Sequence, residues 1–215
     1  LPSIPMSEHN AVARFLESQG FKEEALSVST DLDHRFELAI DLKNLEVAKT
    51  VLYGEKDEAD PSSTDVQNKW RRLGDLALVA GDVELAQLCA TNSGDLSGML
   101  LIYAASANKE GMLELADKAK ATGRTNVAFL AFFVTGQVEQ CINLLIDTKR
   151  LPEAAFMART YMPSMMSGVL QKWKTDLKSI NEKAAEALAD PEKYPNLFPD
   201  LDWALKIESM FLEGR

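Results

Sequence analysis

Residues with metal-binding or nucleophilic chemistry are few in this chain, and they are scattered. His9 and His34 lie far apart in the sequence, and neither has a cysteine or carboxylate at the spacing of a zinc ligand set. Cys89 and Cys141 each lie among apolar neighbours, where a free cysteine behaves as a small hydrophobic residue. The sequence therefore predicts two free thiols, typical of a reducing compartment, with no disulfide, metal ion or cofactor.

Motifs of catalytic sites are not found either. The segment GDLSG at Gly94 has two glycines but lacks the lysine and the spacing of a phosphate-binding loop. No G-x-S-x-G nucleophile motif occurs. A helical toroid can hold two carboxylates for glycoside hydrolysis, but acids such as Glu84 and Glu139 fall near expected helix starts, where they favour the helix dipole. We expect no enzyme activity, and a hydrolase is the least favoured alternative.

Composition narrows the class of partner. The chain has 215 residues, 46% hydrophobic and 26% charged, with a net charge of −10, which is typical of a globular protein and unfavourable for nucleic-acid binding. Two small basic clusters are interpreted as solvated helix faces: Lys69, Arg71 and Arg72, then Lys172, Lys174 and Lys178. No run of about 18 apolar residues is present, so any membrane association is expected to be indirect. The chain opens on LPSIPMS, without a signal-peptide pattern, and is interpreted as a piece of a longer polypeptide.

The elements that must position these residues are helices. Strand alternation and hairpin turns are nearly absent, whereas helical periodicity recurs between single glycines or short polar turns. A repeated frame has a turn residue followed five places later by a small residue. Six pairs fit it: Gly20 and Ala25, Lys43 and Ala48, Gly81 and Ala86, Gly111 and Ala116, Gly136 and Cys141, Arg150 and Ala155.

Two kinds of helix alternate along this frame. SGMLLIYAAS and NVAFLAFFV are apolar on nearly all sides, while helices such as MLELADKAKA are amphipathic. Such pairs bury their apolar surface only by stacking, so residues 1–163 are predicted to form an α-solenoid of helical hairpins. One unit approaches the tetratricopeptide pattern at Trp70, Leu73, Gly74 and Ala86, with Gly74 and Ala86 small because two helices approach closely. The charged segment YGEKDEADPSSTD, residues 53–65, is predicted to be an exposed loop.

The pattern changes over residues 164–215. MMSGVLQKWKTDLKSINEKAAEALAD predicts one long helix, YPNLFPDL an extended proline-rich segment, and Asp202 to Leu212 a final helix capped by Asp200 or Asp202. These elements are expected to pack on the solenoid or on a partner. The apolar stripe of the long helix is a candidate partner interface that could equally cap the solenoid's own end: Leu170, Trp173, Leu177 and Ile180.

Several long segments resemble a known family. DHRFELAIDL, NVAFLAFF, EKAAEALADP and NLFPDL occur in the order found in the C-terminal helical region of coatomer β′ subunits. The resemblance implies a component of the COPI vesicle coat, in which an α-solenoid follows two β-propellers that are missing from this chain. It further implies that the solenoid binds the corresponding solenoid of the coatomer α subunit and joins the other coatomer subunits. The expected location is the cytosolic face of Golgi and COPI vesicle membranes, where the coat serves Golgi-to-ER and intra-Golgi transport.

Residues and resemblance together predict a scaffold that works through contact area. The alternative is a helical-repeat module that binds peptides, but it would need a concave row of Asn, Lys or Arg, and no such row has regular spacing. An unpartnered solenoid is also expected to expose apolar surface and to self-associate.

Overall fold

The computed structural model describes residues 5–56 and 63–214, and these residues form helices and turns without a strand. Two compact units divide the chain, one ending at Ala107 and the other beginning at Asn108. Within each unit, most contacts join helices that are neighbours in the sequence. The prediction of an all-α fold built from stacked helical hairpins is confirmed.

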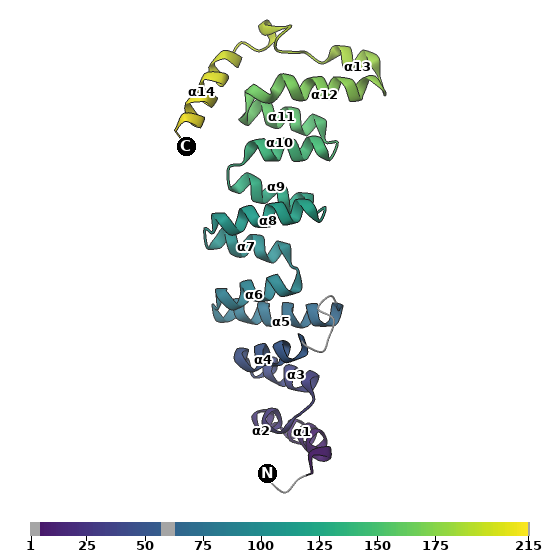
Figure 1. The fold of residues 1–215 in the computed structure, drawn as a ribbon, viewed down its shortest axis with the longest axis vertical. Helices are drawn as coiled ribbons and strands as arrows, with labels where there is room; N and C mark the ends of the chain where they lie inside the picture. The colour runs from purple at the N-terminus through teal and green to yellow at the C-terminus, as the bar shows by residue number, and fades with distance from the viewer. Residues whose placement is uncertain (1–4, 57–62, 215) are drawn as a thin grey trace. The chain divides into compact units, whose positions relative to one another are not determined.

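Unit 1 packs its helices around a row of large side chains. Phe36, Leu52, Trp70 and Leu73 are completely or almost completely buried, and the Tyr53 ring meets the Trp70 ring edge-on with centroids 5.7 Å apart. The first unit begins with the 3₁₀ turn η1 (Met6–Glu8). Its helices are labelled in Figure 1: α1 (His9–Ser18), α2 (Lys22–Val28), α3 (Leu32–Asp41), α4 (Leu45–Lys56), α5 (Thr64–Ala80), α6 (Val83–Ser93) and α7 (Leu96–Ala105).

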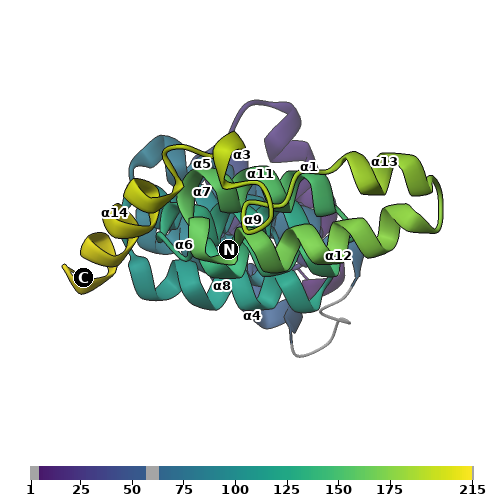
Figure 2. The ribbon, with the colours of Figure 1, turned by 90° about the horizontal axis from the view of Figure 1, so that it is seen from above.

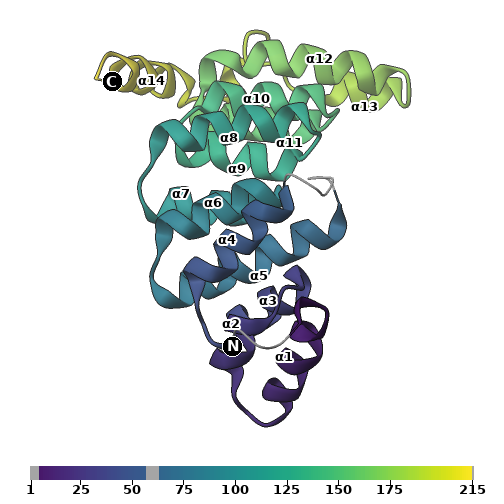
Figure 3. The ribbon, with the colours of Figure 1, turned by 60° about the horizontal axis from the view of Figure 1, so that its bottom comes forward.

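Helices α5 and α6 pack closely against each other in unit 1 and run side by side in Figure 3. A Cβ atom placed on Gly74 would lie 3.0 Å from the Cβ of Cys89, closer than ordinary van der Waals contact. Gly74 is therefore required by the space between two helices, as the tetratricopeptide-like pattern predicts. Ala86, on the facing helix, is also buried.

Two basic residues of α5 bind α3. The guanidinium of Arg72 donates to both carboxylate oxygens of Glu37, at 2.5 and 2.8 Å, and this hydrogen bonding lowers the pKa of Glu37. Lys69 is buried and pairs with Asp33 and, at 3.2 Å, with Asp65. The prediction of a solvated basic face is thus wrong for Lys69, because the ammonium is held by carboxylates of its own unit.

Unit 2 repeats the hairpin arrangement through α12. Met112, Leu115, Ile142 and Val169 are among its most completely buried side chains. Its elements appear in Figures 1 and 2: α8 (Lys109–Ala121), α9 (Thr125–Val134), α10 (Val138–Asp147), α11 (Leu151–Tyr161), η2 (Pro163–Met165), α12 (Met166–Lys178), α13 (Glu182–Ala187), η3 (Pro195–Leu197) and α14 (Leu201–Glu213).

Most chain reversals use one residue with a positive φ followed at once by the N-cap of the next helix. At the α5–α6 turn, Gly81 has a φ of 78°, the Asp82 N–H donates to the Ala77 carbonyl at 2.9 Å, and the Asp82 carbonyl accepts from Ala86 N–H at 3.0 Å. One residue thus closes a helix and opens another. Over residues 5–56 and 63–214, the residues with a positive φ are Gly20, Lys43, Gly81, Gly94, Ala107, Gly123, Gly136 and Lys149.

This geometry corrects the predicted repeat frame. Gly111 lies inside α8 and Arg150 is the N-cap of α11, so neither is the turn residue, and the turns at Gly94 and Gly123 were missed. With the true turn residues, two runs have a spacing of thirteen: 81, 94 and 107, then 123, 136 and 149. The fifth residue after each turn is always buried, but it is not always small: Ala25, Ala48, Ala86, Met99, Met112, Ala128, Cys141 and Ala154.

The single long helix predicted after Pro163 is divided into α12 and α13, which lie beside each other in Figure 2. Ser179 turns its hydroxyl onto the Asp176 carbonyl at 2.7 Å. Asn181 has an extended backbone, and its side chain accepts from Ala184 N–H at 3.1 Å. Short polar side chains that hydrogen-bond to the nearby backbone compete with helix formation, so the helix breaks here although the apolar periodicity continues past the break.

Two further boundaries differ from the prediction. The proline-rich segment is not simply extended, since Pro195 starts the 3₁₀ turn η3; the helix that follows has Asp200 at its N-cap, without a side-chain capping bond. The predicted loop at 53–65 is shorter, because Tyr53 belongs to α4 and Thr64 opens α5. Residues 57–62 of that loop lie outside the described residues.

Candidate interaction surface on the C-terminal helices

The four residues predicted as a partner interface occupy different environments. Leu170 is 7% exposed and belongs to the core of unit 2. Trp173 and Leu177 are half-buried, and the Trp173 ring lies 6.4 Å from the Phe156 ring of α11. Ile180 lies beyond the end of α12 and is 78% exposed. Ile180 is therefore the member of this set that is fully open to a partner.

Further apolar surface lies on α14, the final helix, which was predicted to pack on the solenoid or on a partner. None of the thirteen residues of α14 is buried. Trp203, Ile207 and Met210 form a stripe at helical spacing and are 67%, 63% and 64% exposed. Its other exposed large apolar residues are Leu205, Phe211 and Leu212. No separate signal in the sequence marks which face of this helix is free, because apolar residues lie on several sides.

Polar contacts hold α14 on unit 2. The carboxylate of Glu208 accepts the backbone N–H of Ser164 at 2.9 Å and the Ser164 hydroxyl at 2.5 Å. Ser164 lies in η2, just before α12, so the carboxylate also faces the positive end of that helix. Before α14 begins, the Arg159 guanidinium lies 5.8 Å from the centre of the Phe198 ring. We call the Glu208–Ser164 pair the clasp.

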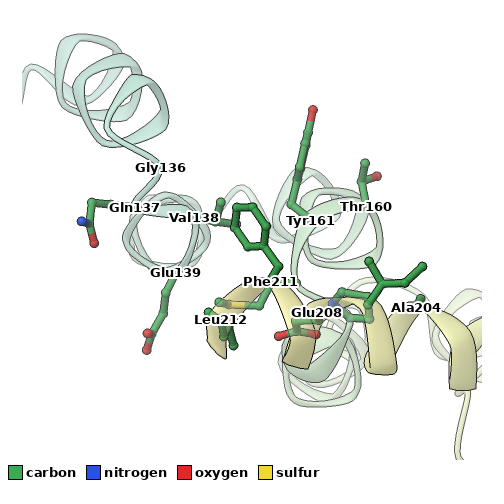
Figure 4. Close-up of a pocket in the computed structure, with 13 residues that line it drawn as sticks. Gly136, Gln137, Val138, Glu139, Thr160, Tyr161, Ala204, Glu208, Phe211 and Leu212 are labelled. Atoms are coloured by element: carbon green, nitrogen blue, oxygen red, sulfur yellow. The ribbon is translucent and has the colours of Figure 1, made fainter. Parts of the chain in front are cut away.

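A cavity of about 470 Å³ remains between α14 and helices α10 and α11. Figure 4 shows the Phe211 ring of α14 directed toward Val138 of α10. Two carboxylates, Glu139 and Glu208, line the cavity and would be the pair a hydrolase needs. Both oxygens of Glu208 are engaged in the clasp, however, and Figure 4 shows the Glu139 carboxylate directed away from the Phe211 ring. This geometry is typical of a packing contact between helices that leaves a cavity, rather than of a site for acid–base catalysis.

An aromatic groove runs along α9 and α11. The Phe129 and Phe133 rings stack with centroids 6.1 Å apart, and Phe133 meets Tyr161 edge-on at 5.7 Å. These rings line a hollow of about 520 Å³ together with Asn126 and Arg150. A peptide-binding module would need a row of polar side chains here, but Arg150 is bound to Glu153 at 3.2 Å, and Asn126 by itself does not make such a row.

Reactive groups are not assembled on the described residues. Among residues 5–56 and 63–214, no cluster of three or more His, Cys, Asp or Glu side chains could hold a metal ion. Burial raises the pKa of the Cys89 thiol to about 12 and that of Cys141 to about 11, so both stay protonated and unreactive near neutral pH. Over the same residues, no helix has the length and apolar character to span a bilayer.

Comparison with known proteins agrees with this helical architecture. A model of the COPA/B TPR domain family matches residues 1–174. The chain belongs to the COPA/B TPR domain family. The match ends within α12, so α13 and α14 follow the part of the family domain that the model covers.

Individual relatives of this COPA/B TPR domain chain are coatomer subunits. It is 48% identical over 209 residues to coatomer subunit beta'-2 of Oryza sativa subsp. japonica and 48% identical over 215 residues to coatomer subunit beta'-1 of Arabidopsis thaliana. It is 45% identical over 213 residues to the coatomer subunit beta' of Homo sapiens. These alignments cover 97%, 100% and 99% of the chain but only 22% of each relative. The predicted resemblance to coatomer β′ subunits is confirmed.

Proposed function

We propose that this chain is a structural part of the COPI vesicle coat that joins other coatomer subunits through its helical surfaces. The observation that carries the proposal is the similarity to coatomer β′ subunits along essentially the whole chain. Exposed apolar side chains on ordered helices support a role in protein contact, since large exposed apolar patches mark interaction sites.

The partner we propose is the helical solenoid of the coatomer α subunit. Lasting subunit interfaces are large and apolar, which suits a stack of helices better than a single groove. The chain would act at the cytosolic face of Golgi and COPI vesicle membranes, held there through the coat, in Golgi-to-ER and intra-Golgi transport. Of the predicted interface set, Ile180 offers the most exposed side chain for this contact.

Co-purification with the α-subunit solenoid tests the proposal. The unmodified chain should retain the α-subunit solenoid through size-exclusion chromatography, and no co-elution at micromolar concentration would contradict the function. Ile180→Asp should weaken retention about tenfold, as expected for loss of one interface anchor of about 1.4 kcal/mol. The matched control is Leu101→Asp on α7, whose side chain is also largely exposed, at 71%. If folded Ile180→Asp binds like the control, Ile180 is outside the interface.

A further inference from the structure

The stripe of α14, defined by Trp203, Ile207 and Met210, is an apolar row of three large side chains that are each more than 60% exposed. The three side chains lie four and three residues apart and therefore on one face of the helix. By helical spacing, Glu208 of the clasp lies on another side of α14 from Trp203 and Met210, so these two side chains face away from η2, while Ile207 lies at the border and also lines the cavity against α10 and α11. Because the helix is already folded and held, a partner would bind it without the entropy cost of ordering it.

Charge along this helix narrows the choice of partner. The segment 200–213 carries four acidic residues and one basic residue: Asp200, Asp202, Glu208, Glu213 and Lys206. Asp202, Lys206 and Glu213 lie along one edge of the stripe by helical spacing. The Lys206 ammonium lies 5.5 Å from the centre of the Trp203 ring, so its charge is directed to the aromatic face. The remaining edge charges are carboxylates, and both Asp202 and Glu213 are exposed.

This charge pattern disfavours two other occupants. Helices that lie in a membrane surface carry Lys and Arg on their polar face, whereas the edge of α14 is acidic and would be repelled by anionic lipids. A second copy would bring two acidic helices together, which like-charge repulsion opposes. An apolar helix edged with lysine or arginine matches both the stripe and its border.

We propose that the outward face of α14 binds an amphipathic helix of another protein, with an apolar face edged by basic residues. Trp203 and Met210 are the apolar anchors, and Asp202 and Glu213 pair with the basic residues of the partner helix. The site concerns one helix of unit 2 and does not depend on the coat function proposed above.

The test uses the full chain and two synthetic helical peptides of about 18 residues, five helical turns. One peptide has a leucine face edged with lysine, and the other is its leucine–glutamate counterpart. Fluorescence anisotropy should show saturable binding of the lysine peptide at moderate salt and at least tenfold weaker binding of the glutamate peptide. Equal binding of the two peptides would overturn the proposal.

Variants locate the site. Trp203→Ala combined with Met210→Ala should weaken binding of the lysine peptide at least tenfold, and Asp202→Asn combined with Glu213→Gln about threefold. The apolar control is Leu101→Ala with Val134→Ala, two exposed residues on other helices; the charge control is Glu114→Gln with Asp117→Asn on the exposed face of α8. Controls that lose as much affinity as the α14 variants would overturn the site. Circular dichroism confirms that each variant is folded.

Two further measurements examine the excluded occupants. Vesicles with about one-third phosphatidylserine should not sediment the chain, and α14-dependent sedimentation would favour a membrane surface instead. Light scattering should give a mass that does not change in Met210→Asp, whether or not other surfaces of the chain self-associate. A dimer that this substitution dissociates would favour a second copy, and either result would overturn the proposal.

Discussion

Three of the chain reversals put a side chain where glycine is less strained. Lys43, Ala107 and Lys149 have φ values of 54°, 53° and 62°, a region in which an L residue crowds its own carbonyl. The other reversals of this kind use glycine. The turns at Lys43, Ala107 and Lys149 make the same kind of backbone hydrogen bonds as the glycine turns. We therefore infer that the protein tolerates backbone strain at these three positions.

Lys149→Gly should therefore stabilise unit 2 by about 0.5–1 kcal/mol, since relief of the strained φ exceeds the entropy that glycine adds to the unfolded chain. The urea midpoint measures the effect. Lys118→Gly is the matched control, because it places the same change inside helix α8, where glycine costs about 1 kcal/mol. A lower midpoint for Lys149→Gly would contradict the prediction.

The buried thiols should make stability fall in mildly alkaline solution. The folded-state pKa of Cys89 is raised from 9.0 to about 12 and that of Cys141 to about 11, so above pH 9 the unfolded chain releases thiol protons that the folded chain retains. Unfolding is then favoured by up to about 1.4 kcal/mol per thiol for each pH unit.

Urea midpoints at pH 7.5, 9 and 10 measure this dependence. The double variant Cys89→Ala, Cys141→Ala should show a shallower decline than the unmodified chain. Equal slopes would show that the thiols ionise alike in both states, contrary to the burial seen here. Slow reaction of the native thiols with iodoacetamide at pH 8 is the accompanying expectation.

At the scale of the element, the contact between α5 and α6 depends on Gly74, because a glycine has no side chain to separate the two helices. Gly74→Ala would bring its Cβ to 3.0 Å from that of Cys89 and should destabilise unit 1 by about 1–3 kcal/mol, as overpacking does. Gly168→Ala is the control, because its Cβ would meet nothing within 4 Å in the first turn of α12, and helix propensity predicts a gain of up to about 1 kcal/mol. Opposite shifts in thermal midpoint are expected, and a neutral Gly74→Ala would contradict the tight contact.

The clasp predicts a local effect on α14. Ser164→Ala removes the hydroxyl donor to Glu208 and should speed amide exchange of residues 201–213 about tenfold, the equivalent of a charged hydrogen bond of about 1.5 kcal/mol. Helices α8 to α11 should keep their exchange rates. Ser209→Ala, an exposed position of α14, is the matched control. Unchanged exchange in Ser164→Ala would mean that the hydroxyl bond to Glu208 does not help to hold the helix.

The sequence predicts helix pairing well because pairing follows from local patterns, but it predicts boundaries poorly where two local effects compete. Trp70, Leu73 and Gly74 carry the tetratricopeptide-like spacing, and all three occupy the expected positions. The break at Ser179–Asn181 was missed because the apolar period continues through it. Turns at Lys149 and Ala107 were misplaced because no glycine marks them.

The candidate site was harder to predict for a tertiary reason. Periodicity identified the stripe through Leu170 and Ile180, but one of these is core and the other is exposed, since the helix ends between them. For α14, apolar residues on several sides leave the free face undefined until Glu208 is seen to bind Ser164, 44 residues earlier. A contact at that separation has no local signature in the sequence.

At the scale of the whole molecule, packing is mainly between successive helices, so damage should stay near its origin. Leu73→Ala and Ile142→Ala each truncate a completely buried side chain and should cost about 2–5 kcal/mol. Amide exchange should accelerate in α4 to α6 for Leu73→Ala and in α9 to α11 for Ile142→Ala, with the other unit unaffected. Uniform acceleration across both units would show instead that the chain unfolds as one cooperative body.

The chain reversals of two or three residues also restrict how such a protein can change in length over evolution. An insertion or deletion of one residue within a helix would rotate every later side chain of that helix by about 100° and carry the buried fifth position to the surface. Because the turns between the helices are so short, the neighbouring segments cannot absorb that rotation. Viable growth or shrinkage should therefore proceed by whole hairpins, each of which contains two helices and two of the thirteen-residue intervals.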